Sequence, residues 1–328
     1  INLITLYHLI FVVKIKNNMR VCILGSGLSA LTLAKALVGQ NIFVDIFCSK
    51  KKTELNFLRT IGISKSNFDY FNNSIVNIEK ICWKINKIEI LTENLHKEKV
   101  LNFENNNNHL FSIVKNFKIY EAVEKSLLKN KKFRKIYKNN YSNLLKKYDL
   151  IVNTDYFSSI TKKFFNKKIL KDYYSFAYIS EIKHKKITNR TATQIFTKYG
   201  PLAFLPVSNT QTSLVFSINK YKKITDQDLI KLVNQYNFNY DIKKFERFNF
   251  FKLESLNLRN YYQDNILAFG DLLHKIHPLA GQGFNMSIRD IKKLLEIIDD
   301  KIELGLPLDK NVCIEFQNKT KSKNLIFS

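Results

Sequence analysis

The sequence predicts an α/β fold, in which a Rossmann-like nucleotide-binding domain is interrupted by a β-rich insert. An apolar run, Arg20–Leu24, ends in Gly25-Ser26-Gly27 and leads into leucines and alanines at helical spacing. A second apolar run, Asn265–Phe269, ends in Gly270-Asp271 near the other end of the chain. Between the two, 173–218 reads mostly as strands. Strand–turn–helix elements at both ends of a β-rich stretch indicate a discontinuous two-domain layout.

The element pattern sets the expected boundaries. We expect 19–75, 98–165 and 263–300 to form the nucleotide-binding domain, 76–97 and 166–262 the inserted substrate domain, and 301–328 the start of a truncated C-terminal helical region. Helices are predicted at 226–236 and 282–298. Residues 1–18 hold an apolar run that is too short to span a bilayer and lacks the features of a signal peptide. Met19 looks like a natural start, so 1–18 is expected to lie outside the native domain and the chain to be a fragment.

Composition narrows the class of partners. The chain has 328 residues, 45% of them hydrophobic, which predicts a globular protein. Lysine and arginine number 53 against 28 acidic residues, a formal net charge of +25. The lysines are dispersed, without an arginine-rich stripe or an aromatic RNA-binding motif, so we expect no nucleic-acid binding but a weak attraction to anionic membranes. The four cysteines are far apart and include no CxxC pair, so no zinc site or disulfide framework is expected.

The first motif, Gly25-Ser26-Gly27-Leu28-Ser29-Ala30, has the GxGxxA form of a dinucleotide-binding turn. Gly25 permits the tight turn, Gly27 lets a diphosphate approach the backbone, and Ala30 allows close packing of helix on strand. The alternative is an ordinary tight strand–helix turn. The usual ribose-binding carboxylate after the second strand is missing, because Cys48 stands there and strand alternation turns Asp45 away from the binding edge.

The second motif follows the late strand and reads GDLLHKIHPLAGQGFN over 270–285, with Arg289-Asp290 after it. The two motifs together hold five of the nine glycines, which indicates that backbone geometry is important in both. One aspartate and two histidines of the second motif also have alternative interpretations. Asp271 could be a helix N-cap, and His274 with His277 could be a metal pair, although no third ligand is indicated.

The second motif resembles the GD…HP…GQG…N…D flavin-binding motif of aromatic hydroxylases, and most of all that of the ubiquinone-biosynthesis hydroxylases, the polyprenyl methoxyphenol hydroxylase group. Three other segments resemble this family in the same order: 59–64 (RTIGIS), 200–206 (GPLAFLP) and 153–159 (NTDYFSS), the last only at Asp155 and one serine. The resemblance implies a Rossmann-like FAD-binding domain of the aromatic-hydroxylase type with an inserted β-rich substrate domain.

The resemblance also implies FAD as cofactor, NAD(P)H as reductant and a role for several residues. Asp271 would bind the ribityl hydroxyls, Arg59 the ribityl–pyrophosphate region, and Asp155 would lie near FAD. Residues 281–283 would place a positive helix end beside the flavin, and Pro278 would line the pocket. Arg59 could instead be a surface salt-bridge partner. The predicted cofactor-binding residues are Gly25, Gly27, Ala30, Arg59, Asp155, Gly270, Asp271, Gly281, Gln282, Gly283 and Asn285.

The function that this resemblance implies is a FAD-dependent monooxygenase that uses NAD(P)H and O2 to hydroxylate the aromatic ring of a polyprenylated phenol in ubiquinone biosynthesis. A C4a-hydroperoxide of the flavin would transfer the oxygen, so no side chain is predicted to be catalytic. A membrane-dissolved substrate implies a cytoplasmic protein peripheral to the inner membrane, and a ubiquinone-synthesis complex is a further expected partner. The alternatives are a flavin-dependent prenyl-chain reductase or dehydrogenase, and a non-catalytic subunit of that complex, which Cys48 and the altered Asp155 segment would favour.

Overall fold

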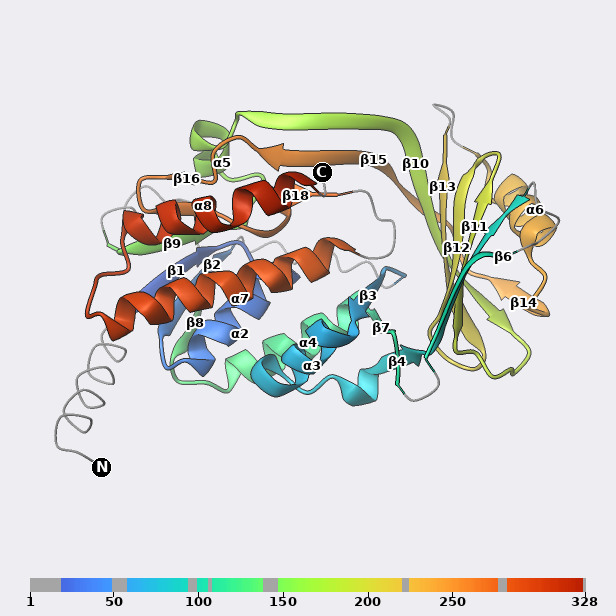
Figure 1. The fold of residues 1–328 in the computed structure, drawn as a ribbon, viewed down its shortest axis with the longest axis horizontal. Helices are drawn as coiled ribbons and strands as arrows, with labels where there is room; N and C mark the ends of the chain where they lie inside the picture. The colour runs from blue at the N-terminus through green and yellow to red at the C-terminus, as the bar shows by residue number, and fades with distance from the viewer. Residues whose placement is uncertain are drawn as a thin grey trace.

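The fold consists of three β-sheets with helices packed against each of them. A computed structural model describes residues 19–48, 58–93, 99–105, 108–137, 147–219, 224–276 and 282–326. The predicted boundary residues 1–18 lie outside the described part. A six-stranded sheet covered by helices and a nine-stranded sheet lie at opposite ends of the molecule, and a three-stranded sheet lies between them (Figure 1).

The six-stranded sheet is the Rossmann-like unit. Its strand order is β16-β17-β9-β1-β2-β8, and all neighbours are parallel except β16 and β17. Its central strands are continuous apolar runs, which is typical of parallel strands whose two faces are both buried. Their bounds are β1 (Arg20–Leu24), β2 (Phe43–Cys48), β8 (Phe133–Tyr137), β9 (Leu150–Asn153), β16 (Tyr262–Gln263) and β17 (Ile266–Ala268).

Helices α2 and α7 pack into this unit through buried apolar side chains. Helix α2 (Leu28–Gly39) is apolar on nearly all sides and has eight buried residues. Helix α7 (Gln282–Glu303) buries one stripe that includes Ile291, Leu294, Ile298 and Ile302, the spacing from which its existence was predicted. The other helices are α3 (Lys65–Tyr70), η1 (Phe71–Ile75), η2 (Glu79–Ile81), α4 (Asn116–Leu128), α5 (Ser159–Phe164), η4 (Gly270–Leu272) and α8 (Lys310–Ile326).

The nine-stranded sheet forms the β-rich unit, with the order β18-β15-β10-β13-β12-β11-β5-β6 and β14 paired to β10. Helix α6 (Asp226–Tyr236) packs on its outer face, away from the Rossmann-like unit (Figure 1). The strands are β5 (Lys87–Thr92), β6 (Lys99–Glu104), β10 (Lys168–His184), β11 (Thr191–Thr197), β12 (Gly200–Pro206), β13 (Gln211–Ile218), β14 (Ile242–Phe245), β15 (Asn249–Leu258) and β18 (His274–Lys275).

Two expected boundaries differ from the observed sheets. Strand β6 falls in 98–165, the range expected to belong to the nucleotide-binding domain, but it pairs with β5 in the nine-stranded sheet. Strand β4 (Cys82–Ile85) falls in 76–97, the range expected to belong to the insert, but it pairs with β7 (Phe111–Lys115), which also pairs with β3 (Thr60–Ser64) in the three-stranded sheet. The chain therefore leaves the three-stranded sheet after β4, forms the β5–β6 hairpin in the nine-stranded sheet and returns with β7, so a boundary between β5 and β6 separates two paired strands.

Polar contacts join the three-stranded sheet to the nine-stranded sheet. The hydroxyl of Thr60 donates to the hydroxyl of Ser213 at 3.1 Å, and the ammonium group of Lys115 lies 2.7 Å from the buried carboxylate of Glu181. Thr60 is the β-partner of Lys115, and Ser213 is the β-partner of Glu181. The two contacts therefore lie side by side, and they fix the inner face of the nine-stranded sheet against the strand that begins after Arg59.

A buried carboxylate, Asp45, connects four segments of the Rossmann-like unit. Arg134 on β8 donates to both its oxygens at 2.7 Å, Arg20 on β1 donates at 3.1 Å, and the hydroxyl of Tyr148 donates at 2.6 Å. Burial alone would raise the pKa of Asp45, but the hydrogen bonds from Arg134 and Tyr148 and the two positive charges lower it overall. Asp45 thus serves the fold and not the binding edge, as strand alternation indicated.

We predict that Asp45→Asn lowers the free energy of unfolding by about 2 kcal/mol near neutral pH, because Tyr148 and two arginines lose a charged acceptor. The pKa of Asp45 is lower in the folded than in the unfolded chain. Its contribution is therefore present above the unfolded value of about 4 and is lost as pH falls through the folded value. Urea unfolding from neutral to acidic pH would show a smaller acid-dependent loss in the variant.

The matched control is Asp69→Asn, which removes an exposed carboxylate that pairs with Lys65 four residues before it. This change is expected to alter the free energy of unfolding by less than about 0.5 kcal/mol. Equal effects of the two substitutions would contradict the structural role of Asp45.

Candidate cofactor site

The loops that carry both glycine motifs meet at one edge of the six-stranded sheet. Leu24 at the end of β1 is paired in parallel with Phe47 on β2 and with Asn153 on β9, and Asn153 is paired with Ala268 on β17. The turns after β1, β9 and β17 therefore leave the sheet at the same, carboxyl edge. This is the edge at which open α/β sheets bind their ligands.

Gly25 is required by the fold itself. Its φ is +101°, and a Cβ atom at this position would lie 2.4 Å from the hydroxyl oxygen of Thr154. The same hydroxyl donates to the carbonyl of Leu24 at 2.8 Å. Gly25 thus turns the chain tightly against the segment that follows β9.

Gly27 is different, because the protein alone does not require it. Its φ of −69° suits any residue, and a Cβ atom there would meet no atom within 4 Å. Gly27 is the N-cap of α2, whose first turn has no side-chain cap and no acidic residue. The open space and the positive helix end fit a diphosphate that approaches the backbone.

The late motif directly contacts the early one. Gly270 has φ +63°, and a Cβ atom there would lie 3.0 Å from the Cβ atom of Ser29 in the first turn of α2. Ser29 also donates a hydrogen bond to Ser287 on α7 at 3.2 Å. Asp271 follows in η4 with an exposed side chain, and the N-cap of that helix is Phe269, so Asp271 is not a helix cap. No hydrogen-bond or ion-pair partner of its carboxylate lies among the described residues, and its exposure allows it to face a ligand.

Arg59 precedes β3 beside the start of α4, where its carbonyl accepts from the backbone of Asn116 at 2.8 Å, and Asp155 follows β9 at the carboxyl edge. Arg59 is exposed, and its side chain forms no hydrogen bond or ion pair with another described residue, so the structure gives no support to the salt-bridge alternative. Asp155 is half-buried, and its carboxylate accepts from the backbone N–H of Phe157 at 3.0 Å. The backbone nitrogen of Asp155 would lie 3.2 Å from a Cβ atom at Gly25. Asp155 thus shapes the loop beside the glycine turn.

The start of α7 contributes Gln282, Gly283 and Asn285. Gln282 is exposed, and a Cβ atom at Gly283 would meet nothing within 4 Å. The amide of Asn285 donates to Gly62 at 2.8 Å and accepts from the backbone of Ser64 at 3.0 Å. Asn285 therefore ties α7 to β3, a role that its sequence context did not indicate, and its role towards the cofactor stays a prediction. Pro278 and Gly281 lie outside the described residues.

Cys48 occupies the place of the usual ribose carboxylate at the end of β2. Burial raises the pKa of its thiol, although nearby Lys135 and a hydrogen bond with Ser26 oppose this effect. The thiol is therefore neutral near pH 7 and a weak acceptor for hydroxyl groups.

The alternative role considered for His274 was that of a metal ligand. Its ring instead forms a hydrogen bond of 2.5 Å with the carboxylate of the buried Asp290. The described residues contain no cluster of three or more metal-ligating side chains.

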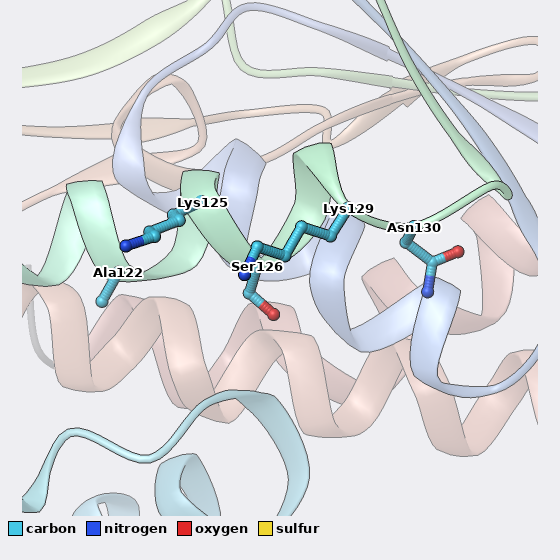
Figure 2. A pocket seen from close by; sticks show the side chains of 5 residues that line it. All are labelled: Ala122, Lys125, Ser126, Lys129 and Asn130. Atoms are coloured by element: carbon cyan, nitrogen blue, oxygen red, sulfur yellow. The ribbon is translucent and has the colours of Figure 1, made fainter.

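A surface hollow of about 440 Å³ lies away from this edge. Figure 2 shows its lining, which consists of Ala122, Lys125, Ser126, Lys129 and Asn130 from the end of α4 and the turn after it. That turn leads into β8, which is parallel to β2, so the hollow lies at the amino edge of the sheet. It is therefore separate from the site that the glycine motifs form.

Comparison with known proteins bears on the cofactor. The family model described as FAD binding domain matches residues 168–302, from β10 to α7. The chain is 30% identical over 115 residues to 3-demethoxyubiquinol 3-hydroxylase of Escherichia coli, covering 32% of this chain and 28% of that protein. It is 24% identical over 180 residues to the ubiquinone biosynthesis monooxygenase COQ6 of Caenorhabditis elegans, covering 42% of this chain and 40% of that protein.

The predicted resemblance to the FAD-dependent hydroxylase family of ubiquinone biosynthesis is confirmed. FAD as the expected cofactor is confirmed as well. The chain spans about two fifths or less of the length of these two relatives. A third relative, ubiquinone hydroxylase UbiL of Rhodospirillum rubrum, is 27% identical over 164 residues, covering 46% of this chain and 37% of that protein.

Solved structures show the fold over almost the whole chain. PqsL of Pseudomonas aeruginosa, a probable FAD-dependent monooxygenase, superposes with a TM-score of 0.75 at 15% identity, covering 94% of this chain and 93% of that chain. The flavin-dependent halogenase CmlS superposes with a TM-score of 0.72 at 12% identity, covering 94% of this chain and 62% of that chain. The predicted fold class is thus confirmed, and proteins with different reactions share it.

We predict that Gly27→Ser lowers the affinity for FAD at least about tenfold, because the side chain fills the space next to the first turn of α2 and competes for its N–H groups. Serine is a good N-cap, so the free energy of unfolding of the flavin-free protein should stay the same or rise slightly. Flavin fluorescence titration and urea unfolding measure the two effects.

The matched control is Gly25→Ala, which should instead lower the free energy of unfolding, because of its positive φ and the contact with Thr154. Binding of FAD by Gly27→Ser with unchanged affinity would show that the open space at Gly27 does not receive the diphosphate.

Proposed function

We propose that this chain is the FAD-binding and substrate-binding part of a monooxygenase that uses NAD(P)H and O2 to hydroxylate the aromatic ring of a polyprenylated phenol in ubiquinone biosynthesis. The observation that carries the proposal is the contact between the first turn of α2 and Gly270. It brings two motifs from opposite ends of the chain to one edge, where a single FAD molecule could contact both. The names of the sequence relatives support the substrate class.

The residues of the chain would bind and orient the cofactor, which supplies the redox and oxygen chemistry when bound. The first turn of α2 would present N–H groups and a positive helix end to the diphosphate. The carboxylate of Asp271 can accept hydrogen bonds from ribityl hydroxyls, and the guanidinium group of Arg59 can pair with negative charge. Gly283 leaves the first turn of α7 open to a ring that becomes anionic when reduced.

The inner face of the nine-stranded sheet would form one wall for the substrate. Ser213 identifies this face, because its hydroxyl contacts that of Thr60, and every second residue along a strand lies on the same face. Ala177 and Ser217 lie opposite each other on this face, and both are small and buried. Small side chains leave room for a ring between the sheet and the cofactor edge, and a closed wall of this kind would exclude water from the reaction.

We propose further that the protein works at the cytoplasmic face of the inner membrane, in contact with anionic lipid and with a ubiquinone-synthesis complex. A polyprenylated phenol dissolves in the bilayer, and the net charge of +25 favours an anionic surface. Among the described residues, no helix is both long and apolar enough to cross a membrane.

The deciding experiment is complementation. The full-length protein would be expressed in strains that each lack one ubiquinone hydroxylase, and the quinone intermediates would be identified by mass. We expect one strain to regain its missing product, and Asp271→Ala to abolish the rescue because the ribityl chain loses its acceptor. The conservative Asp271→Asn should retain part of it.

The outcomes separate the alternatives. Failure in every strain, despite bound FAD, would exclude ring hydroxylation. Product formation without oxygen would indicate a prenyl-chain reductase or dehydrogenase. A folded protein that contains no flavin would favour a non-catalytic subunit, for which the neutral Cys48 is the structural argument.

A further inference from the structure

An exposed cluster of aromatic, aliphatic and lysine side chains lies next to the cofactor edge. We call it the aromatic–lysine patch. Its apolar members are unusually exposed for their size, with Phe157 at 80%, Leu170 at 58% and Tyr174 at 57% of their full surface. The complete patch consists of Tyr156, Phe157, Ile169, Leu170 and Tyr174 with Lys162, Lys163, Lys167, Lys168 and Lys171.

Contacts between its members make the patch continuous. The rings of Tyr156 and Phe157 lie 5.2 Å apart between centroids, in the turn before α5. The ammonium group of Lys168, at the start of β10, lies 4.1 Å from the centre of the Tyr156 ring. Strand alternation places Lys168 and Leu170 on the face of β10 that meets Tyr156, and Ile169 and Lys171 on the other face, so the patch wraps around this part of the strand. Figure 1 shows α5 and the first half of β10 together along the upper edge of the molecule, at the opposite end from α6.

Among the described residues, the first half of β10 is paired on one side only. Lys168 and Leu170 pair with β15, whereas pairing with β13 begins only at Phe176. Open edges usually carry charged residues that prevent pairing with another chain, and the lysines meet that need. The need to protect an edge does not explain the large exposed apolar side chains next to these lysines. Contiguous exposed apolar groups usually mark a surface that a partner covers.

The charge of the patch is positive. The nearby carboxylate of Asp172 is paired with Lys252 at 2.6 Å, and that of Asp155 contributes one negative charge. The five patch lysines therefore leave an excess of positive charge around the apolar groups. Aromatic rings with flanking lysines suit the boundary of a bilayer, where the rings enter the headgroup layer and the ammonium groups meet lipid phosphates.

We propose that the aromatic–lysine patch docks on an anionic phospholipid bilayer. This assigns a surface to the membrane contact included in the proposed function, and in that sense it rests on that function. The turn that bears Phe157 directly follows Asp155, which packs against the Gly25 turn. Docking would therefore place the carboxyl edge of the Rossmann-like sheet close to the lipid surface that holds an apolar substrate.

The test uses flotation of the whole chain with vesicles of phosphatidylcholine alone and of phosphatidylcholine mixed equally with phosphatidylglycerol. We expect binding only to the anionic vesicles. The double variant Phe157→Ser/Leu170→Ser should lower the partition coefficient at least about tenfold through lost apolar burial. The double variant Lys167→Gln/Lys171→Gln should lower it about tenfold or more through lost charge. Circular dichroism confirms that each variant is folded.

The matched control is Leu128→Ser on α4, because Leu128 is 63% exposed and lies between Lys125 and Lys129. Its partition coefficient should not change. A loss as large as that of the patch variants, or binding to neutral and anionic vesicles alike, would overturn the proposal, since general charge or stickiness would then explain the binding. A patch variant that instead alters the oligomeric state would show that the open edge pairs with a second copy.

A tryptophan reporter gives an independent measurement. The emission of Phe157→Trp should shift to shorter wavelength on anionic vesicles, and an unshifted spectrum with bound protein would contradict insertion of this turn. Neither measurement needs reductant, oxygen or turnover. Vesicle binding that persists in a chain that fails every complementation would refute the hydroxylation and leave the docking surface standing, whereas the reverse pattern would refute the docking alone.

Discussion

The steric contact between two backbone turns is the constraint on which the site depends. Gly25 lies so close to Thr154, and Gly270 so close to Ser29, that a side chain at either glycine would have to displace its neighbour. Both glycines have positive φ, so a substitution would also strain the backbone. The first turn of α2 is thereby held between the segment after β9 and the segment after β17. A dinucleotide that binds this helix end would therefore lie beside the segment that carries Asp271.

The rest of the molecule supports this contact from two directions. The Asp45 network joins β1, β2, β8 and the segment before β9, so the strands that carry the turns share one buried anchor. On the other side, Asn285 ties α7 to β3, which places the start of α7 beside the same edge. The site is thus open to a ligand while its supports are buried and hydrogen-bonded, an arrangement that keeps binding groups in place.

The sequence predicted the parts of the fold that local pattern controls. Strand β1, helix α6 and the existence of α7 follow from apolar periodicity, and the glycine turns follow from motif chemistry. Strand β8 was missed because its lysine and arginine are polar, although Arg134 is there to meet Asp45. The roles of Thr154, Asn285 and Glu181 could not be found, because each depends on a partner far away in the sequence. The pairing of β4 with β7 was misjudged for the same reason, whereas β6 pairs with β5, the strand directly before it in the chain.

The ion pair between Lys115 and Glu181 has a consequence for how the two ends of the molecule fit together. Separating Lys115 from the buried carboxylate of Glu181 would leave a buried charge without its partner, a cost that non-directional apolar contact does not impose. Together with the hydroxyl contact of Thr60 and Ser213, the ion pair therefore determines the relative position of the two sheets more than the strength of their association. Under the proposed function, that position would set the distance between the nine-stranded sheet and the cofactor edge.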